Sequence, residues 1–169
     1  MSRLAELTRK VDAFFARVTD RHGSDMQCTT GCSDCCHVQL TITAVEAAAI
    51  RAHVAAWPSE LRRDLANTEL GSDRCAALDS AGKCKVYDAR PLVCRSHGVP
   101  IRLTRGSLPV VQSCHRNFTR TAPDPDCILD QATLSATLYA IDAAEGGAGP
   151  ARPPARIELA GLLADLAAI

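Results

Sequence analysis

The residues with the most obvious chemistry are nine cysteines, all between Cys28 and Cys127 of a 169-residue chain. Four of them fall within nine residues, in the run Cys28-Thr-Thr-Gly-Cys32-Ser-Asp-Cys35-Cys36. Thiolate is the soft ligand that zinc and iron–sulfur clusters select, and gaps of two or three residues are typical of metal ligands. Gly31 permits the tight turn that several converging sulfurs need. This first cluster therefore predicts a metal–thiolate site.

The adjacent pair Cys35 and Cys36 adds a constraint. In extended backbone, successive side chains point to opposite sides. An extended pair would then serve two different metal atoms, or one thiol would ligate while the other packs.

A second cluster comprises Cys75, Cys84 and Cys94. The segment 80–82, Ser-Ala-Gly, predicts a turn that would let Cys75 and Cys84 face each other across a small loop. Arg90 and Arg95 flank Cys94, and cations near thiolates lower the thiol pKa and offset the negative charge of a thiolate site. We therefore expect both arginines to help hold the bound cofactor.

Cys114 and Cys127 complete the set, so nine thiols would supply two four-thiolate sites with one left over. His37, His97 and His115 lie beside or near a cysteine, and each could ligate the metal or hydrogen-bond a ligating sulfur. His22 and His53 have no cysteine neighbour in the sequence. Asp124-Pro125-Asp126 is interpreted as the start of a helix rather than as a metal site.

The combined pattern resembles the YkgJ family of bacterial cysteine-cluster proteins, which is described as a zinc- or iron-chelating domain. The resemblance covers residues 28–97: the C-x3-C-x2-C-C run, then Cys75, Gly-Lys-Cys-Lys-Val-Tyr at 82–87 and Arg-Pro-Leu-Val-Cys-Arg at 90–95. It implies metal binding but no settled reaction. A related cluster occurs in flagellin lysine methylases, which are longer proteins. The candidate metal ligands are the seven family cysteines and the two beyond them: Cys28, Cys32, Cys35, Cys36, Cys75, Cys84, Cys94, Cys114 and Cys127.

The identity of the metal stays open between zinc and iron. Structural zinc sites usually use two well-separated ligand pairs, whereas a [4Fe–4S] cluster often takes three thiolates from one short run and a distant fourth. Cys28, Cys32 and Cys35, with one thiol of the second cluster, fit the iron–sulfur pattern slightly better. The same three also match the motif of radical S-adenosylmethionine enzymes. Those resemble α/β barrels of about 200 residues or more, and this chain lacks their strand–helix alternation.

Composition and charge exclude several classes of function. The chain has 19 basic and 19 acidic residues, so it lacks the basic surplus of a general nucleic-acid binder. It has no apolar run of about 18 residues that would span a membrane, and its first residues do not form a signal peptide. We therefore expect a cytoplasmic protein. In that reducing compartment disulfides are rare, and the odd cysteine count also disfavours a disulfide framework.

The elements that position these residues are mainly helical. Apolar residues from Leu4 to Val18 recur every three or four positions, which predicts an amphipathic helix. Thr43 and Glu46 form a capping box ahead of a helix over 44–57, and a shorter helix follows over 59–67. The segment 99–114 predicts a hairpin with its turn at 105–107 and with Pro109 on an edge strand.

Further helices are predicted over the C-terminal third of the chain. One begins at Asp126 or Asp130 and runs to Glu145, and another spans 157–169, after a Gly/Pro-rich connector at 146–156. The fold class is mostly α with a small β hairpin, in one compact domain (1–145) organised around the metal.

The sequence thus predicts a cysteine-cluster protein that binds zinc or iron and has no nucleic-acid or membrane partner. The alternative is an iron–sulfur enzyme or redox partner that acts on a protein or peptide substrate. A third reading is an interaction protein whose metal only shapes a docking surface. The patterns identify no catalytic residue.

Overall fold

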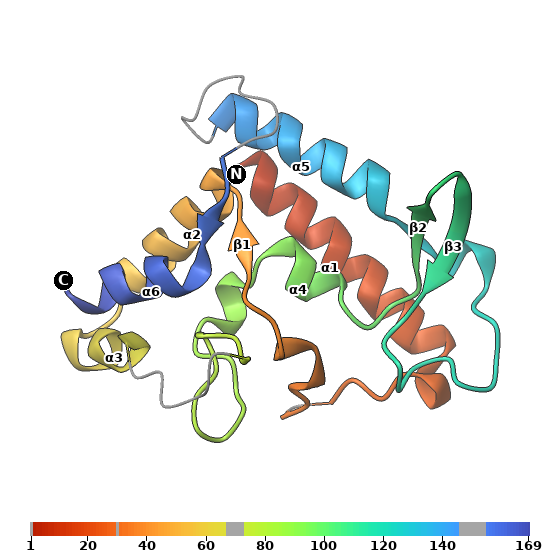
Figure 1. Cartoon of the computed structure of the whole chain (residues 1–169), viewed down its shortest axis with the longest axis horizontal. Coiled ribbons are helices and arrows are strands. Elements are labelled where there is room, and N and C mark those ends of the chain that lie inside the picture. The colour runs from red at the N-terminus through yellow and green to blue at the C-terminus, as the bar shows by residue number, and fades with distance from the viewer. Residues whose placement is uncertain (1, 30, 67–72, 146–154) are drawn as a thin grey trace. The chain divides into compact units, whose positions relative to one another are not determined.

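The computed structural model describes residues 2–29, 31–66, 73–145 and 155–169. It is mostly helical with short strands, which confirms the predicted mostly α class with a small β hairpin, whereas the organisation around a metal stays a prediction (Figure 1). The chain divides into two compact units. Unit 1 comprises Met1–Thr29 and Leu92–Ala140, and unit 2 comprises Thr30–Pro91 and Ile141–Ile169. The predicted connector lies largely outside the described residues, so its boundaries stay a prediction.

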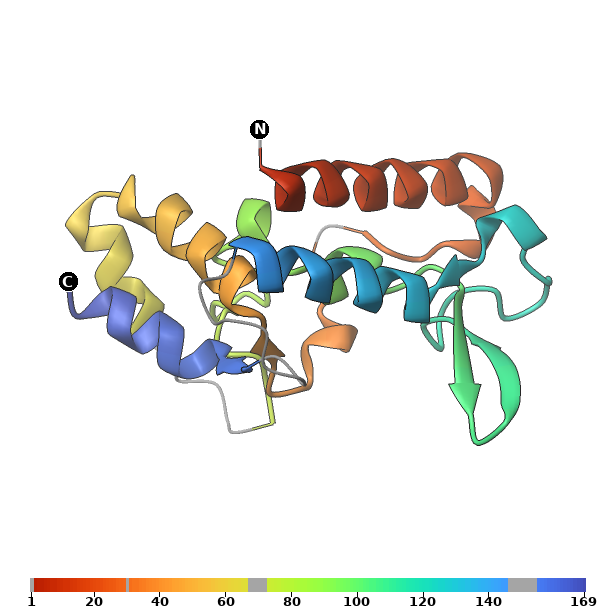
Figure 2. The ribbon, with the colours of Figure 1, turned by 90° about the horizontal axis from the view of Figure 1, so that it is seen from above.

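Unit 1 begins with helix α1 (Arg3–Arg21). Ser2 caps it, because the Ser2 hydroxyl oxygen accepts the Ala5 N–H at 3.1 Å. Leu4, Val11 and Val18 are its buried residues, as the apolar spacing predicts. The short helix α4 (Leu92–Ser96) packs against α1 within this unit (Figures 1 and 2).

The predicted hairpin is confirmed as β2 (Ile101–Arg105) and β3 (Leu108–Gln112). Gly106 takes a φ of +62° in its turn. Strand β4 (Leu129–Asp130) pairs in parallel with the other side of β2, so β3, which carries Pro109, is an edge strand as predicted. Figure 2 shows the two arms of the hairpin.

Unit 2 contains helix α2 (Ala44–Ala55), which starts at the predicted capping box and ends two residues earlier than predicted. The Thr43 N–H donates to Glu46 Oε2 at 3.0 Å. A second carboxylate reaches the same helix end, since Asp142 Oδ1 accepts the Val45 N–H at 2.8 Å. Both acidic residues are buried, at 5% and 1% exposed, and they satisfy backbone donors that the helix leaves unpaired.

The C-terminal segment 157–169 differs from the predicted helix at its start. Strand β5 (Ile157–Glu158) pairs with β1 (Thr41–Ile42), and helix α6 (Leu159–Ala167) begins only after it. The Leu159 N–H donates to the Leu40 carbonyl at 2.9 Å. The first residues of this segment therefore form hydrogen bonds with β1 and with Leu40 instead of starting the helix. The apolar periodicity could not reveal this non-local partner.

The core of unit 2 consists of buried residues of α2 and α6 together with Leu65, Leu78 and Val86. Helix α3 (Ser59–Arg63) continues as a 3-10 turn (Asp64–Ala66), close to the predicted extent, and packs with α6. Ile50, Leu65 and Leu162 are among the almost fully buried side chains of this core. Cys75 is part of this cluster, and Cys36 and Cys84 pack against it. Three of the five candidate ligands of unit 2 are therefore anchored in or against its apolar core.

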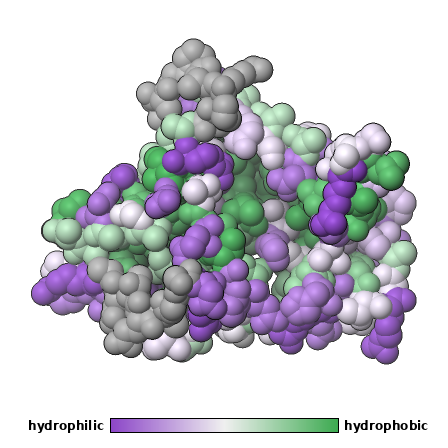
Figure 3. Space-filling view, in the orientation of Figure 1, coloured by the Kyte–Doolittle hydropathy of each residue, from purple (hydrophilic) through white to green (hydrophobic). Residues whose placement is uncertain are grey.

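Helix α5 (Gln131–Glu145) settles which aspartate caps the predicted helix. Asp130 does so, because its carboxylate accepts the Thr133 N–H at 2.8 Å. Other 3-10 turns are Gly23–Asp25, Asp34–Cys36, Tyr87–Ala89 and Pro125–Cys127. None of the helices in the described segments combines the length and apolar character that a bilayer crossing requires. Polar and apolar side chains are interspersed on the face that Figure 3 shows.

Candidate metal centre

The nine cysteines all lie in the described part of the chain, and no disulfide joins any of them there. The division between the units falls inside the first cluster, after Thr29. Unit 2 contains Cys32, Cys35, Cys36, Cys75 and Cys84, and unit 1 contains Cys28, Cys94, Cys114 and Cys127. Each group is described within its own unit.

Cys35 and Cys36 do not adopt the extended backbone that would separate their side chains. They lie on the 3-10 turn Asp34–Cys36, which the Cys36 N–H closes by donating to the Ser33 carbonyl at 2.8 Å. The two sulfur atoms are 4.0 Å apart. Thiolates at about 2.3 Å from one tetrahedral zinc ion lie about 3.8 Å from each other. The neighbouring thiols can therefore reach a single metal atom.

Cys75 is brought to this pair by the backbone. Its N–H donates to the Cys36 carbonyl at 2.7 Å, a contact between segments 39 residues apart in the sequence. The Cys75 residue is 6% exposed. This hydrogen bond joins the backbone of Cys75 to that of Cys36, and, after the larger effect of burial, the charge of Cys35 raises the pKa of the Cys75 thiol.

Cys84 follows from the predicted turn. Gly82 has a φ of +76°, its N–H donates to the Asp79 carbonyl at 3.0 Å, and the turn returns the chain so that Cys84 pairs with Leu78 in an isolated β-bridge. A negative charge on Cys75 raises the pKa of Cys84, which places these two thiols within electrostatic range. The turn at 80–82 is thus confirmed.

The surroundings of these thiols favour the protonated form in the absence of a metal. The pKa of Cys35 is raised, first by its side-chain hydrogen bond with Cys36 and then by burial. Burial is the main cause of the raised pKa of Cys75 and of Cys84. Metal binding would have to displace these protons, because the thiolate is the ligating form.

The two predicted cofactor-holding arginines have different surroundings. The Arg90 guanidinium lies 3.5 Å from the centre of the Tyr87 ring, and its charge partly opposes the burial that raises the pKa of Cys84. Arg95 is on α4 and donates to both carboxylate oxygens of Asp12, at 3.1 and 2.8 Å. Arg90 thus acts on a thiol, whereas the charge of Arg95 is opposed by a carboxylate of α1.

Unit 1 fixes Cys28 through a residue that the sequence did not single out. Asn117 is 3% exposed, and its amide nitrogen donates to Cys28 Sγ at 3.3 Å and to the Gly98 carbonyl at 2.8 Å. Its amide oxygen accepts the Gln27 N–H at 2.8 Å. Gly98 has a φ of +105°, and a Cβ there would lie 2.7 Å from the Cys28 sulfur. Any residue with a Cβ at position 98 would displace the Cys28 sulfur from its observed position.

The other cysteines of unit 1 are spread over separate elements. Cys94 lies on α4, and Cys127 ends the 3-10 turn Pro125–Cys127 and is fully buried. The Cys114 carbonyl accepts the Asn117 N–H at 2.9 Å. Whether these three thiols ligate a metal stays a prediction.

The three histidines near cysteines have diverse settings. His37 Nδ1 lies 3.9 Å from an Asp73 carboxylate oxygen. Burial lowers the pKa of His97, which favours the neutral imidazole that can bind a metal. His115 is exposed.

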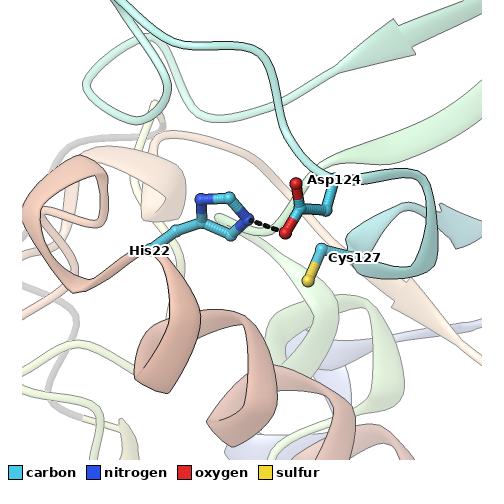
Figure 4. A group of neighbouring side chains, drawn as sticks. All are labelled: His22, Asp124 and Cys127. Carbon is cyan, nitrogen blue, oxygen red and sulfur yellow. Dashed lines mark ion pairs between the residues drawn. The ribbon is translucent and has the colours of Figure 1, made fainter.

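Within the described residues, one group of three His, Cys or acidic donor atoms lies mutually within 4.8 Å, and the sequence did not predict it. It consists of His22, Asp124 and Cys127 of unit 1 (Figure 4). Asp124 does begin a 3-10 turn, as its sequence suggested, but its carboxylate also faces His22. In the sequence, the spacing of Asp124 and Cys127 could have suggested two neighbouring metal ligands. It does not reveal that His22 lies beside them.

The comparisons with known proteins agree with the cysteine pattern. The sequence profile of the CxxCxxCC family, described as "Putative zinc- or iron-chelating domain", matches residues 27–123. This is more than half of the chain, and the chain belongs to this family. Its first gap, from Cys28 to Cys32, has three residues where the family name has two. No curated protein and no solved structure matches the chain.

Proposed function

We propose that this protein chelates zinc or iron through thiolates of unit 2, with Cys35, Cys36, Cys75 and Cys84 as the ligands. The observation that carries the proposal is the 2.7 Å hydrogen bond from the Cys75 N–H to the Cys36 carbonyl, which joins the backbone of a first-cluster cysteine to that of a second-cluster cysteine within unit 2. The family description supports the same two metals.

The donor set suits either metal. Four thiolates complete a tetrahedral zinc site, and they also hold the four corners of a [4Fe–4S] cluster. The 4.0 Å separation of the Cys35 and Cys36 sulfurs is close to the spacing on one zinc ion. Binding requires the sulfurs of Cys75 and Cys84 to approach that pair. Arg90 offsets part of the negative charge that four thiolates accumulate.

The proposal also includes four of the five other cysteines and the slight preference for iron over zinc that the sequence indicates. Cys32 would replace one of the four ligands in unit 2 if one of them does not bind, and Cys28, Cys94 and Cys114 of unit 1 would serve a second thiolate site. The alternative function is an iron–sulfur enzyme or redox partner that acts on a protein or peptide. It requires an open coordination position or an exposed cluster, whereas a chelating or structural role requires every ligating thiol to be closed in.

The test is anaerobic purification of the full chain, followed by metal analysis and a visible spectrum. A brown protein that contains iron and acid-labile sulfide indicates an iron–sulfur cluster, and a colourless protein with stoichiometric zinc indicates a zinc site. Cys75→Ser should remove the metal of unit 2. Cys114→Ser, the matched thiol replacement in unit 1, should leave that metal in place.

Two results would contradict the assignment. Equal metal losses in Cys75→Ser and Cys114→Ser would show that the thiols of unit 2 are not a separate site. A folded protein that takes up neither zinc nor iron would refute metal chelation altogether.

A further inference from the structure

A second donor group lies in unit 1, outside residues 27–123 that match the family. His22 Nε2 is 3.4 Å from Asp124 Oδ2, and the Cys127 sulfur completes a set of three atoms mutually within 4.8 Å (Figure 4). These residues share no ligand with the thiolate site proposed for unit 2.

Each side chain of this group is held by its surroundings. His22 ends α1, where its N–H donates to the Val18 carbonyl at 2.9 Å, and its ring packs edge-on to Phe118 at 5.2 Å. The Cys127 N–H donates to the Asp124 carbonyl at 2.9 Å, which closes the turn that carries both residues. Since the group is fixed by the helix end and this turn, its donors are pre-positioned without a ligand.

The imidazole nitrogen of this group lies 3.4 Å from the Asp124 carboxylate but forms no hydrogen bond with it, although the structure describes both side chains. His22 Nε2 is buried, and no hydrogen bond satisfies it in the described part of the chain. A buried polar atom without a partner costs about 1–3 kcal/mol, so such atoms are rare in native proteins. The Asp124 side chain is 56% exposed, so the carboxylate donor of this group is in contact with solvent.

The arrangement distinguishes a metal site from a nucleophilic triad. In a cysteine–histidine–aspartate triad, the thiol and the carboxylate must contact opposite nitrogens of the ring. In Figure 4, Asp124 and Cys127 both lie on the Nε2 side of His22. Three donors that converge on one point suit a cation, whereas they cannot relay a proton through the ring.

We propose that His22, Asp124 and Cys127 bind a divalent cation of the zinc class. Imidazole, carboxylate and thiolate are the three ligand types of zinc, and three protein ligands leave a fourth position for water. Nitrogen and oxygen ligands of a tetrahedral zinc ion lie about 3.4 Å apart, the separation of the His22 and Asp124 atoms, and nitrogen and sulfur ligands about 3.6 Å apart. The Cys127 sulfur therefore needs to move by about 1 Å at most.

The experiment uses cadmium as the probe on the full chain under reducing conditions, because its NMR shift reports how many sulfur ligands surround it. The wild type should give a resonance typical of one sulfur ligand, separate from that of any sulfur-rich site. Asp124→Asn should weaken cadmium and zinc binding at this site by more than about 100-fold, since loss of even an outer-shell partner costs 10–100-fold.

The matched control is Asp126→Asn. Asp126 lies two residues further on and pairs with Arg21 rather than with His22, so its replacement should leave the one-sulfur resonance intact. Cys75→Ser should also leave it intact, which separates failure of this site from failure of the unit 2 site. Circular dichroism checks that each variant is folded, and the exposed Asp124 side chain makes an isosteric replacement there compatible with folding.

Three outcomes would overturn the proposal. The one-sulfur resonance could be missing from the wild type, it could persist in Asp124→Asn, or it could disappear equally in Asp126→Asn. His22→Gln provides a second variant, and retention of the resonance there would be equally decisive.

Discussion

Gly98 is the position where one added methyl group tests how the fold holds Cys28. Gly98→Ala would place a Cβ 2.7 Å from the Cys28 sulfur and 3.4 Å from the amide nitrogen of Asn117. Carbon and larger atoms rest at about 3.5–4.0 Å, so the sulfur must move by about 1 Å. Cys28 is exposed and can rotate away, but it then loses the hydrogen bond that Asn117 donates to it.

The expected loss of stability has two parts. A residue with a Cβ at a φ of +105° costs about 1–3 kcal/mol in backbone strain. Rotation of the thiol costs one hydrogen bond, about 0.5–1.5 kcal/mol, which is less than the cost of leaving the clash in place. The first part depends only on position 98, and the second exists only while Cys28 has its sulfur.

A double-mutant cycle separates the two parts. Urea denaturation of the metal-free, reduced protein would compare Gly98→Ala in the wild type with the same change in a Cys28→Ala background. We expect the substitution to cost about 0.5–1.5 kcal/mol less when the sulfur is absent. Gly106→Ala is the matched control, because Gly106 also has a positive φ but has open space around its Cα.

The reasoning would be refuted by an equal cost of Gly98→Ala in the two backgrounds. It would also fail if Gly106→Ala showed the same dependence on Cys28. Either result would mean that Gly98 serves the backbone alone and does not position this thiol.

Two further predictions concern the helix ends. Asp142→Ala should lower the free energy of unfolding by about 1.5–3 kcal/mol in urea denaturation, because it strands the buried Val45 N–H; an unchanged stability would contradict this. At α5, the Thr133 N–H lowers the pKa of Asp130. The ionised Asp130 carboxylate therefore stabilises the folded state above the ordinary carboxyl pKa, and this stabilisation is lost as the pH falls through the lowered pKa of Asp130. NMR titration should show this lowered pKa, and Asp130→Asn should remove that part of the acid dependence.

Local signals account for the elements that the sequence predicted well. The capping box of Thr43 and Glu46 and the hairpin around Gly106 depend on neighbours a few residues apart. The position of Pro109 on an edge strand follows from its missing N–H, and the sheet order confirms it. Such features need no knowledge of distant segments.

Most of the features that the sequence missed or left open involve distant segments. Residues 157–158 form a strand because β1, more than a hundred residues earlier, offers its backbone groups. The conformation of Cys35 and Cys36 could be stated only conditionally, and the 3-10 turn decides it. His22 had no cysteine neighbour in the sequence, yet Cys127 lies beside it in the fold.

By itself, the sequence determined the kind of chemistry: nine thiols at ligand spacing, which imply a soft-metal ligand set and the family to which the chain belongs. The tertiary structure decided which of the segments that carry these thiols come together. It joins Cys36 to Cys75, holds Cys28 with Asn117, and places Cys127 beside His22 and Asp124. Ligand type is a property of each side chain, whereas convergence depends on long-range packing and hydrogen bonds that no local spacing encodes.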